Sequence, residues 1–112
     1  MYFDNHTQHP SAKINPALFW EYDLEYFDFQ KEIQVVVQRV IERGASEDFY
    51  AMFNLYGAEA VKATTRNIPS FCQRDLEFIN NVLEVPYSEL LAYQNMKTFP
   101  DQWPHKGVPI RL

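Results

Sequence analysis

Residues 20–29 hold the side chains most able to do chemistry, because acidic and aromatic residues alternate there. The acids are Glu21, Asp23, Glu25 and Asp28, and the aromatics are Trp20, Tyr22, Tyr26, Phe27 and Phe29. Paired carboxylates can transfer protons or bind a divalent cation. The spacing lacks the glycine turn of a calcium loop, so the sequence favours a segment whose aromatics anchor it to a core while its acids face water. The open alternative is a partner-binding face, with Trp20, Tyr22, Tyr26 and the distant Trp103 as the predicted contacts.

Other reactive or metal-binding side chains are few. His6 and His9 have the spacing of metal ligands, but the polar N-terminal segment provides no pre-organised site. Cys72 has no histidine close in sequence to act as a base, although a helix N-terminus would lower the pKa of its thiol. Three glycines cannot build a phosphate-binding loop, and the sequence contains no hydrolase, metalloprotease or kinase motif. The sequence therefore predicts a protein that is not an enzyme and that holds no cofactor and no metal.

Length and composition restrict the class of protein. A chain of 112 residues forms one domain, and 46% apolar residues is a globular composition. Ten basic and fifteen acidic residues give a net charge of −5, which argues against a polycationic nucleic-acid binder. One cysteine excludes an internal disulfide. No apolar run approaches the roughly 20 residues of a membrane span, and no secretory signal is recognisable, so we expect a cytoplasmic protein without membrane contact.

The elements that must position these residues are helices. Apolar residues recur at helical spacing from Phe29 to Ile41, which predicts a helix over 29–43. Asp28 is the expected cap of this helix, and Gly44 should end it in the left-handed conformation. A second helix should begin at a Ser46 cap, carry Glu47 and Asp48 at its positive end, and stop at Gly57.

Three further helices complete the predicted fold. We expect a third helix over roughly 58–67, with Val61, Thr64 and Ile68 on its apolar face. A fourth should start near 71–73, and a short fifth should follow Pro86. The result is an all-α bundle of about five helices over residues 16–93, preceded by a flexible arm (1–15) and followed by an extended tail (94–112).

The second and third predicted helices meet at Tyr56-Gly57, which makes them a candidate helix-turn-helix pair. In such a unit the second helix would present Lys62 and Arg66 to DNA, and Arg39 and Arg43 could add contacts to the phosphate backbone. The low pI of about 5.1 opposes this interpretation. The alternative is an ordinary αα-hairpin that only packs.

Several stretches in this order resemble a small bacterial family of unknown function. They are Leu18-Phe19-Trp20-Glu21-Tyr22-Asp23, Asp28-Phe29, Glu42-Arg43-Gly44, Asp48-Phe49, Tyr56-Gly57, and Pro86 with Glu89. The resemblance implies a helical, helix-turn-helix-like domain. It also implies an antitoxin-like role, because some members are encoded beside nucleotidyltransferase-type toxins. The chain departs from the family pattern at Cys72, which is a poorer helix cap than the serine expected there.

These observations together predict a non-enzymatic, antitoxin-like binding domain. Its partner would be a protein, either a toxin or a second copy of the chain, and DNA is a further candidate ligand. The alternative is a stand-alone homo-oligomeric structural domain with no nucleic-acid role.

Overall fold

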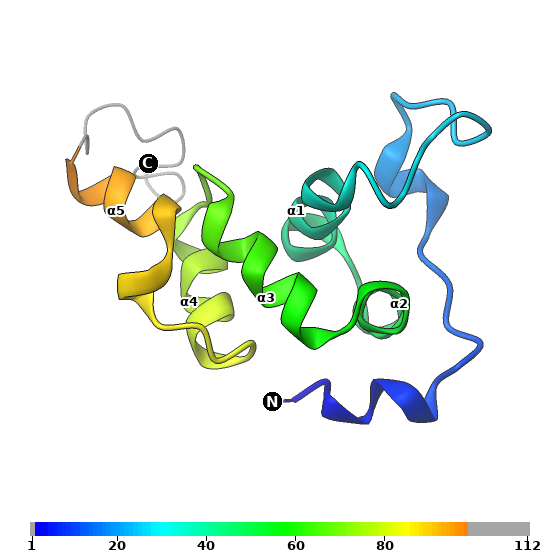
Figure 1. The fold of residues 1–112 in the computed structure, drawn as a ribbon, viewed down its shortest axis with the longest axis horizontal. Helices are drawn as coiled ribbons and strands as arrows, with labels where there is room; N and C mark the ends of the chain where they lie inside the picture. The colour runs from blue at the N-terminus through cyan, green and yellow to red at the C-terminus, as the bar shows by residue number, and fades with distance from the viewer. Residues whose placement is uncertain (1, 99–112) are drawn as a thin grey trace. The chain divides into compact units, whose positions relative to one another are not determined.

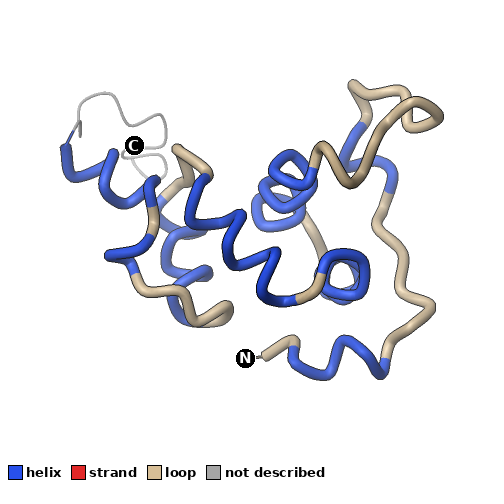
Figure 2. Tube along the Cα trace, in the orientation of Figure 1, coloured by secondary structure: helices blue, strands red, loops and turns tan. Residues whose placement is uncertain are grey.

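The computed structural model describes residues 2–98, and within them it is built of helices without any strand (Figures 1 and 2). The α-helices are α1 (Ile33–Arg43), α2 (Ser46–Tyr56), α3 (Ala58–Asn67), α4 (Gln73–Asn81) and α5 (Leu91–Thr98), and the 3-10 helices are η1 (Asp4–Gln8), η2 (Pro16–Phe19) and η3 (Tyr87–Glu89). The predicted all-α fold is therefore confirmed. In this part of the chain, no helix has the length and apolar character needed to cross a membrane.

Over the described residues, the chain divides into two compact units, residues 2–64 and residues 65–98. The core of the first unit forms where α1 meets α2 and η2. Its fully or nearly fully buried side chains include Leu18, Phe19, Val36, Val37, Val40, Ile41, Phe49, Met52 and Phe53. The apolar stripe predicted for the first long helix is therefore confirmed, and it is the seam that holds this unit together.

The boundaries of α1 differ from the prediction at both ends. The helix begins at Ile33 instead of residue 29, because the Asp28 carboxylate accepts hydrogen bonds from the backbone N–H groups of Gln30 and Lys31 and closes a separate turn first. Gly44 ends the helix as expected, but its φ of −76° is extended backbone and not left-handed. A Cβ at Gly44 would lie only 2.6 Å from the Val40 carbonyl oxygen, so close approach is what requires glycine here.

The start of α2 is organised by Asp48, whereas the sequence indicated Ser46. Ser46 is the first helical residue, and the cap position is Ala45, whose side chain cannot accept a hydrogen bond. The buried Asp48 carboxylate takes over this role: it accepts from the Ala45 N–H at 2.8 Å and from the Asn15 N–H at 2.7 Å. The Asp48 side chain therefore stabilises the first turn of α2 and also holds the backbone at Asn15, in the segment between η1 and η2.

The segment expected to be a flexible arm packs against α2 in the structure. Phe3 is buried, with 4% of its surface exposed, and its ring stacks on Phe49. η1 contacts α2, and in Figure 1, where α2 is seen end-on, η1 lies crosswise to it. The polar composition of residues 2–15 predicted an arm in water, but the buried Phe3 ring and the ring contacts of His6 and His9 attach it to α2.

The second unit contains α4, η3 and α5. Its buried apolar side chains are Ile68, Phe71, Leu76, Ile79, Leu83, Val85, Leu90 and Ala92. On α3 the buried threonine is Thr65 and not the predicted Thr64, a shift of one position around the helix. The fourth helix starts at Gln73, as the predicted range allowed, with Cys72 at the cap position, where no side-chain capping hydrogen bond is formed.

Two predictions in this unit need correction. The pKa of the Cys72 thiol is raised, chiefly by burial, and not lowered as a helix N-terminus would make it. The predicted extended tail is helical over residues 94–98, which complete α5. The remainder of that tail, 99–112, lies outside the described residues.

Candidate functional site

The acid–aromatic loop, defined here as residues 20–27, lies between η2 and the turn before α1, and it is drawn in tan in Figure 2. Trp20 has 74% of its surface exposed, Tyr26 80% and Tyr22 39%. Large aromatic side chains that are exposed in this way leave apolar surface in water instead of burying it in a core. The structure brings these three predicted contact residues onto one loop, and their binding role stays a prediction. Trp103, the fourth, lies outside the described residues.

Phenylalanine side chains anchor this loop to the first unit. The ring of Phe27 lies 5.4 Å from that of the buried Phe19 and 4.8 Å from that of Phe29, measured between centroids. Tyr22 meets Phe27 edge-on at 5.2 Å. Each such pair adds roughly 0.5–1.5 kcal/mol beyond the area that it buries. The expectation of aromatic anchoring is therefore correct for Phe27 and Phe29, while Trp20 and Tyr26 point outward from the anchored loop.

Backbone turns hold the loop between its anchors. The Asp23 carboxylate accepts from the Glu25 N–H at 3.1 Å, and the Asp23 carbonyl accepts from the Tyr26 N–H at 3.0 Å. This local pattern is an Asx turn, which fixes the backbone without regular secondary structure. The acids of this segment therefore have local structural uses, and among the described residues no group of three or more histidine, cysteine, aspartate or glutamate side chains could hold a metal ion.

Arg39 of α1 ties the loop to the helix. Its guanidinium donates to both carboxylate oxygens of Glu21 and, at 2.8 Å, to the carbonyl oxygen of Leu18. The same guanidinium lies 5.8 Å from the centroid of the Tyr22 ring. A forked arginine–carboxylate pair fixes direction as well as distance. Arg39 therefore positions the loop, whereas the sequence indicated it as a contact to DNA phosphates.

The ion pair predicts how stability depends on pH. A hydrogen bond from Arg39 is the main cause that lowers the pKa of Glu21 from 4.5 to about 2. A carboxyl with a lower pKa in the folded state stabilises the fold above its unfolded pKa, and this contribution is lost as the pH falls through the folded pKa. We expect Glu21→Gln to be less stable than wild type at about pH 6 and nearly equal to it at about pH 2 in urea unfolding. A difference that stayed constant over this range would contradict the assignment.

The residues predicted to contact DNA are less favourably placed. Arg66 pairs with Glu89 at 2.7 Å within the second unit, and Lys62 is partly buried on α3. The only residue between α2 and α3 is Gly57, whereas a helix-turn-helix connects its helices through three or four residues. The helix pair exists as predicted, but the two helices are joined by a single residue instead of the turn of a helix-turn-helix.

The rings of His6 and His9 contact different side chains of α2. Nδ1 of His6 lies 2.9 Å from the Asn54 side-chain oxygen, and the His9 ring stacks on Tyr50 at 4.0 Å between centroids. Sequence reasoning missed the positioning roles of both Arg39 and Asp48. Their partners Glu21 and Asn15 lie 18 and 33 residues away, and no local spacing indicates such pairs.

Comparison with known proteins gives one match. Residues 14–65 match a family described as a family of unknown function (DUF6922). The matched region contains the acid–aromatic loop, α1, α2 and most of α3. No curated protein and no solved structure matches the chain.

Proposed function

We propose that this chain is a non-enzymatic, antitoxin-like binding domain of the bacterial cytoplasm, whose acid–aromatic loop contacts a protein partner. The observation that carries the proposal is the exposure of Trp20 and Tyr26 on a loop that is otherwise anchored by the half-buried Phe27, which contacts the buried Phe19, and by Arg39. Aromatic side chains of this kind are the residues that dominate binding energy at protein interfaces. A fixed loop also loses little conformational entropy when it binds.

The charge of the loop indicates the chemistry of the partner. Glu21, Asp23 and Glu25 flank the exposed rings, so a surface with basic residues around an apolar centre would complement it. Arg39 neutralises Glu21, which leaves Asp23 and Glu25 as the acidic side chains at the rim. The resemblance described above makes a nucleotidyltransferase-type toxin encoded beside this protein the first candidate partner.

DNA binding through Lys62 and Arg66 is the weaker part of the proposal. The pairing of Arg66 with Glu89 and the net charge of −5 both reduce attraction to phosphates. Titration of duplex DNA at low salt tests it, and absence of binding there would remove this part while leaving the protein contact intact.

Co-purification with the product of the neighbouring gene tests the protein contact. The variant Trp20→Ala/Tyr26→Ala should lower the affinity at least tenfold while its circular dichroism and unfolding midpoint stay close to wild type, since both side chains are exposed. Leu91→Ala is the matched control, because Leu91 is a 41% exposed apolar residue of α5. An unchanged affinity of the double variant would contradict the proposal, and a concentration-dependent dimer without another partner would favour the homo-oligomeric alternative.

A further inference from the structure

A second aromatic surface lies on α2, where it is covered by the chain's own N-terminus. We define the aromatic face as Phe49, Tyr50 and Phe53, and the strap as residues 2–9. The Phe3 ring of the strap stacks on Phe49 with centroids 4.8 Å apart, and it meets Tyr50 at 5.5 Å and Phe53 at 5.8 Å. Phe3 is the one buried residue of the strap, and the rings of His6 and His9 add contacts to Phe53 at 5.7 Å and to Tyr50 at 4.0 Å between centroids.

The polar contacts of the strap are exposed to water. Nδ1 of His6 lies 2.9 Å from the side-chain oxygen of Asn54. The amide nitrogen of Asn54 donates a hydrogen bond to the His9 carbonyl oxygen at 2.8 Å. Water competes for hydrogen bonds in exposed positions, so these contacts set the direction of the strap more than its affinity. The strap therefore has the composition of a short peptide ligand, with one aromatic anchor and a polar remainder.

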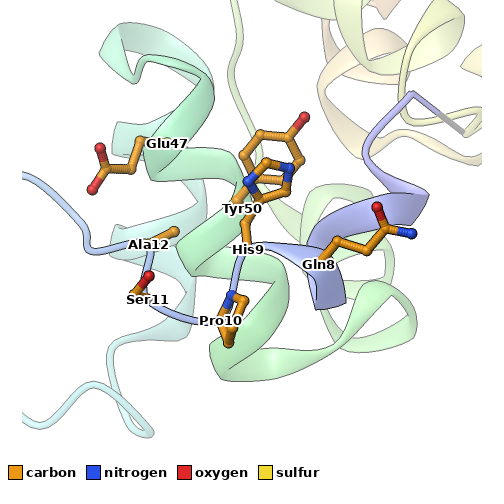
Figure 3. Close-up of a pocket in the computed structure, with 7 residues that line it drawn as sticks. All are labelled: Gln8, His9, Pro10, Ser11, Ala12, Glu47 and Tyr50. Atoms are coloured by element: carbon orange, nitrogen blue, oxygen red, sulfur yellow. The ribbon is translucent and has the colours of Figure 1, made fainter.

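The end of the strap is not close-packed against α2. A pocket of about 380 Å³ opens there between Gln8, Pro10 and Ser11 on one side and Glu47 and Tyr50 of α2 on the other. Figure 3 shows the His9 ring lying over Tyr50 beside this pocket. This pocket is open to solvent, so water borders the contact between this end of the strap and α2.

The family match also separates the aromatic face of α2 from the strap. It begins at residue 14 and therefore contains the whole of α2 but none of the strap. The aromatic face lies inside the matched region, and the strap lies outside it.

We propose that the aromatic face of α2 is a peptide-binding surface and that the strap is its tethered ligand. A ligand added in trans would need the chemistry of the strap, which is one aromatic side chain followed by short polar residues that can bond to Asn54. The tether gives the strap an effective concentration on the order of millimolar, so the strap competes with any such ligand and keeps the surface closed. This surface is distinct from the acid–aromatic loop, and its test does not depend on the function proposed above.

A labelled peptide with the sequence of residues 2–9 tests the proposal on the full-length chain. In the Phe3→Ala chain the strap loses its anchor, so fluorescence anisotropy should show saturable binding of the peptide at least tenfold tighter than to wild type. A peptide in which the residue corresponding to Phe3 is alanine should not bind. The chain Phe3→Ala/Tyr50→Ala should bind the unchanged peptide at least tenfold more weakly than Phe3→Ala, because Tyr50 contacts both Phe3 and His9.

Equal binding to wild type and Phe3→Ala, or no binding to either, would overturn the proposal. Thr7→Ala is the matched control within the strap, since Thr7 is exposed, and it should behave as wild type. If Phe3→Ala loses its helical circular dichroism, amide hydrogen exchange of wild type decides. The N–H groups of His6 and His9, which donate to Phe3 and His6 carbonyls, should then exchange at least tenfold faster than those of α2. Equal exchange rates would show that the strap opens only with the whole unit and would overturn the proposal.

Discussion

Replacing Asp48 with alanine should lower the free energy of unfolding by roughly 3–6 kcal/mol, since each of its two hydrogen bonds to a charged acceptor contributes about 1.5–3 kcal/mol. Asp48 is 5% exposed and accepts from two backbone N–H groups, those of Asn15 and Ala45. Alanine would leave these donors without their acceptor and would remove a negative charge from the positive end of α2. Urea unfolding monitored by circular dichroism measures the change.

Glu47→Ala is the matched control for Asp48. Glu47 is the adjacent acid in the same first turn, but it is exposed, and it accepts from the Lys13 N–H at 3.1 Å. Its replacement should change stability by at most about 1 kcal/mol, as is usual for exposed polar contacts. Equal losses for the two variants would contradict the role assigned to Asp48, because helix-dipole effects alone would then explain both.

Gly57→Ala should destabilise the protein by about 1–3 kcal/mol, the usual cost of holding a non-glycine residue in a sparsely populated backbone region. Gly57 has φ +85° and ψ 153° between α2 and α3, a conformation that is essentially restricted to glycine. A Cβ at this position would meet nothing within 4 Å, so the expected loss comes from the backbone alone. Thermal and urea unfolding both report it.

The sign of the Gly57 effect is itself diagnostic. At a position with negative φ, a glycine-to-alanine change stabilises by about 0.4–1 kcal/mol because it restricts the unfolded chain. A stabilising Gly57→Ala variant would therefore mean that residue 57 does not have the positive φ that turns the chain from α2 into α3.

The sequence was informative wherever one local pattern determined the structure. The apolar stripe from Val36 to Ile41 predicted α1, and its burial is confirmed. The predicted start of that helix was wrong, because the Asp28 carboxylate accepts hydrogen bonds from nearby N–H groups and forms a separate turn. The prediction of a flexible N-terminal arm was wrong for another reason. The stacking of Phe3 on Phe49 joins residues far apart in sequence, and no periodicity indicates such a contact.

The sequence indicated which residues form the candidate site, but it did not indicate which of them anchor the loop and which are exposed. The alternation of acids and aromatics over residues 20–29 indicated both anchoring and partner contact, and the structure divides these roles between Phe27 inside and Trp20 and Tyr26 outside. Arg39 was expected to add a contact to the DNA phosphate backbone, and it binds Glu21 instead. Only the tertiary arrangement of α1 and η2 brings these two residues together.

Hydrogen exchange of the co-purified complex tests the central claim most directly. If the acid–aromatic loop is the protein-binding surface, amides of residues 20–27 should exchange at least tenfold more slowly in the complex than in the free chain. These include the N–H of Tyr22, which donates to the Phe19 carbonyl of η2, and that of Tyr26, which donates to the Asp23 carbonyl. Slower exchange confined to residues 65–98, with unchanged rates in the loop, would contradict the claim.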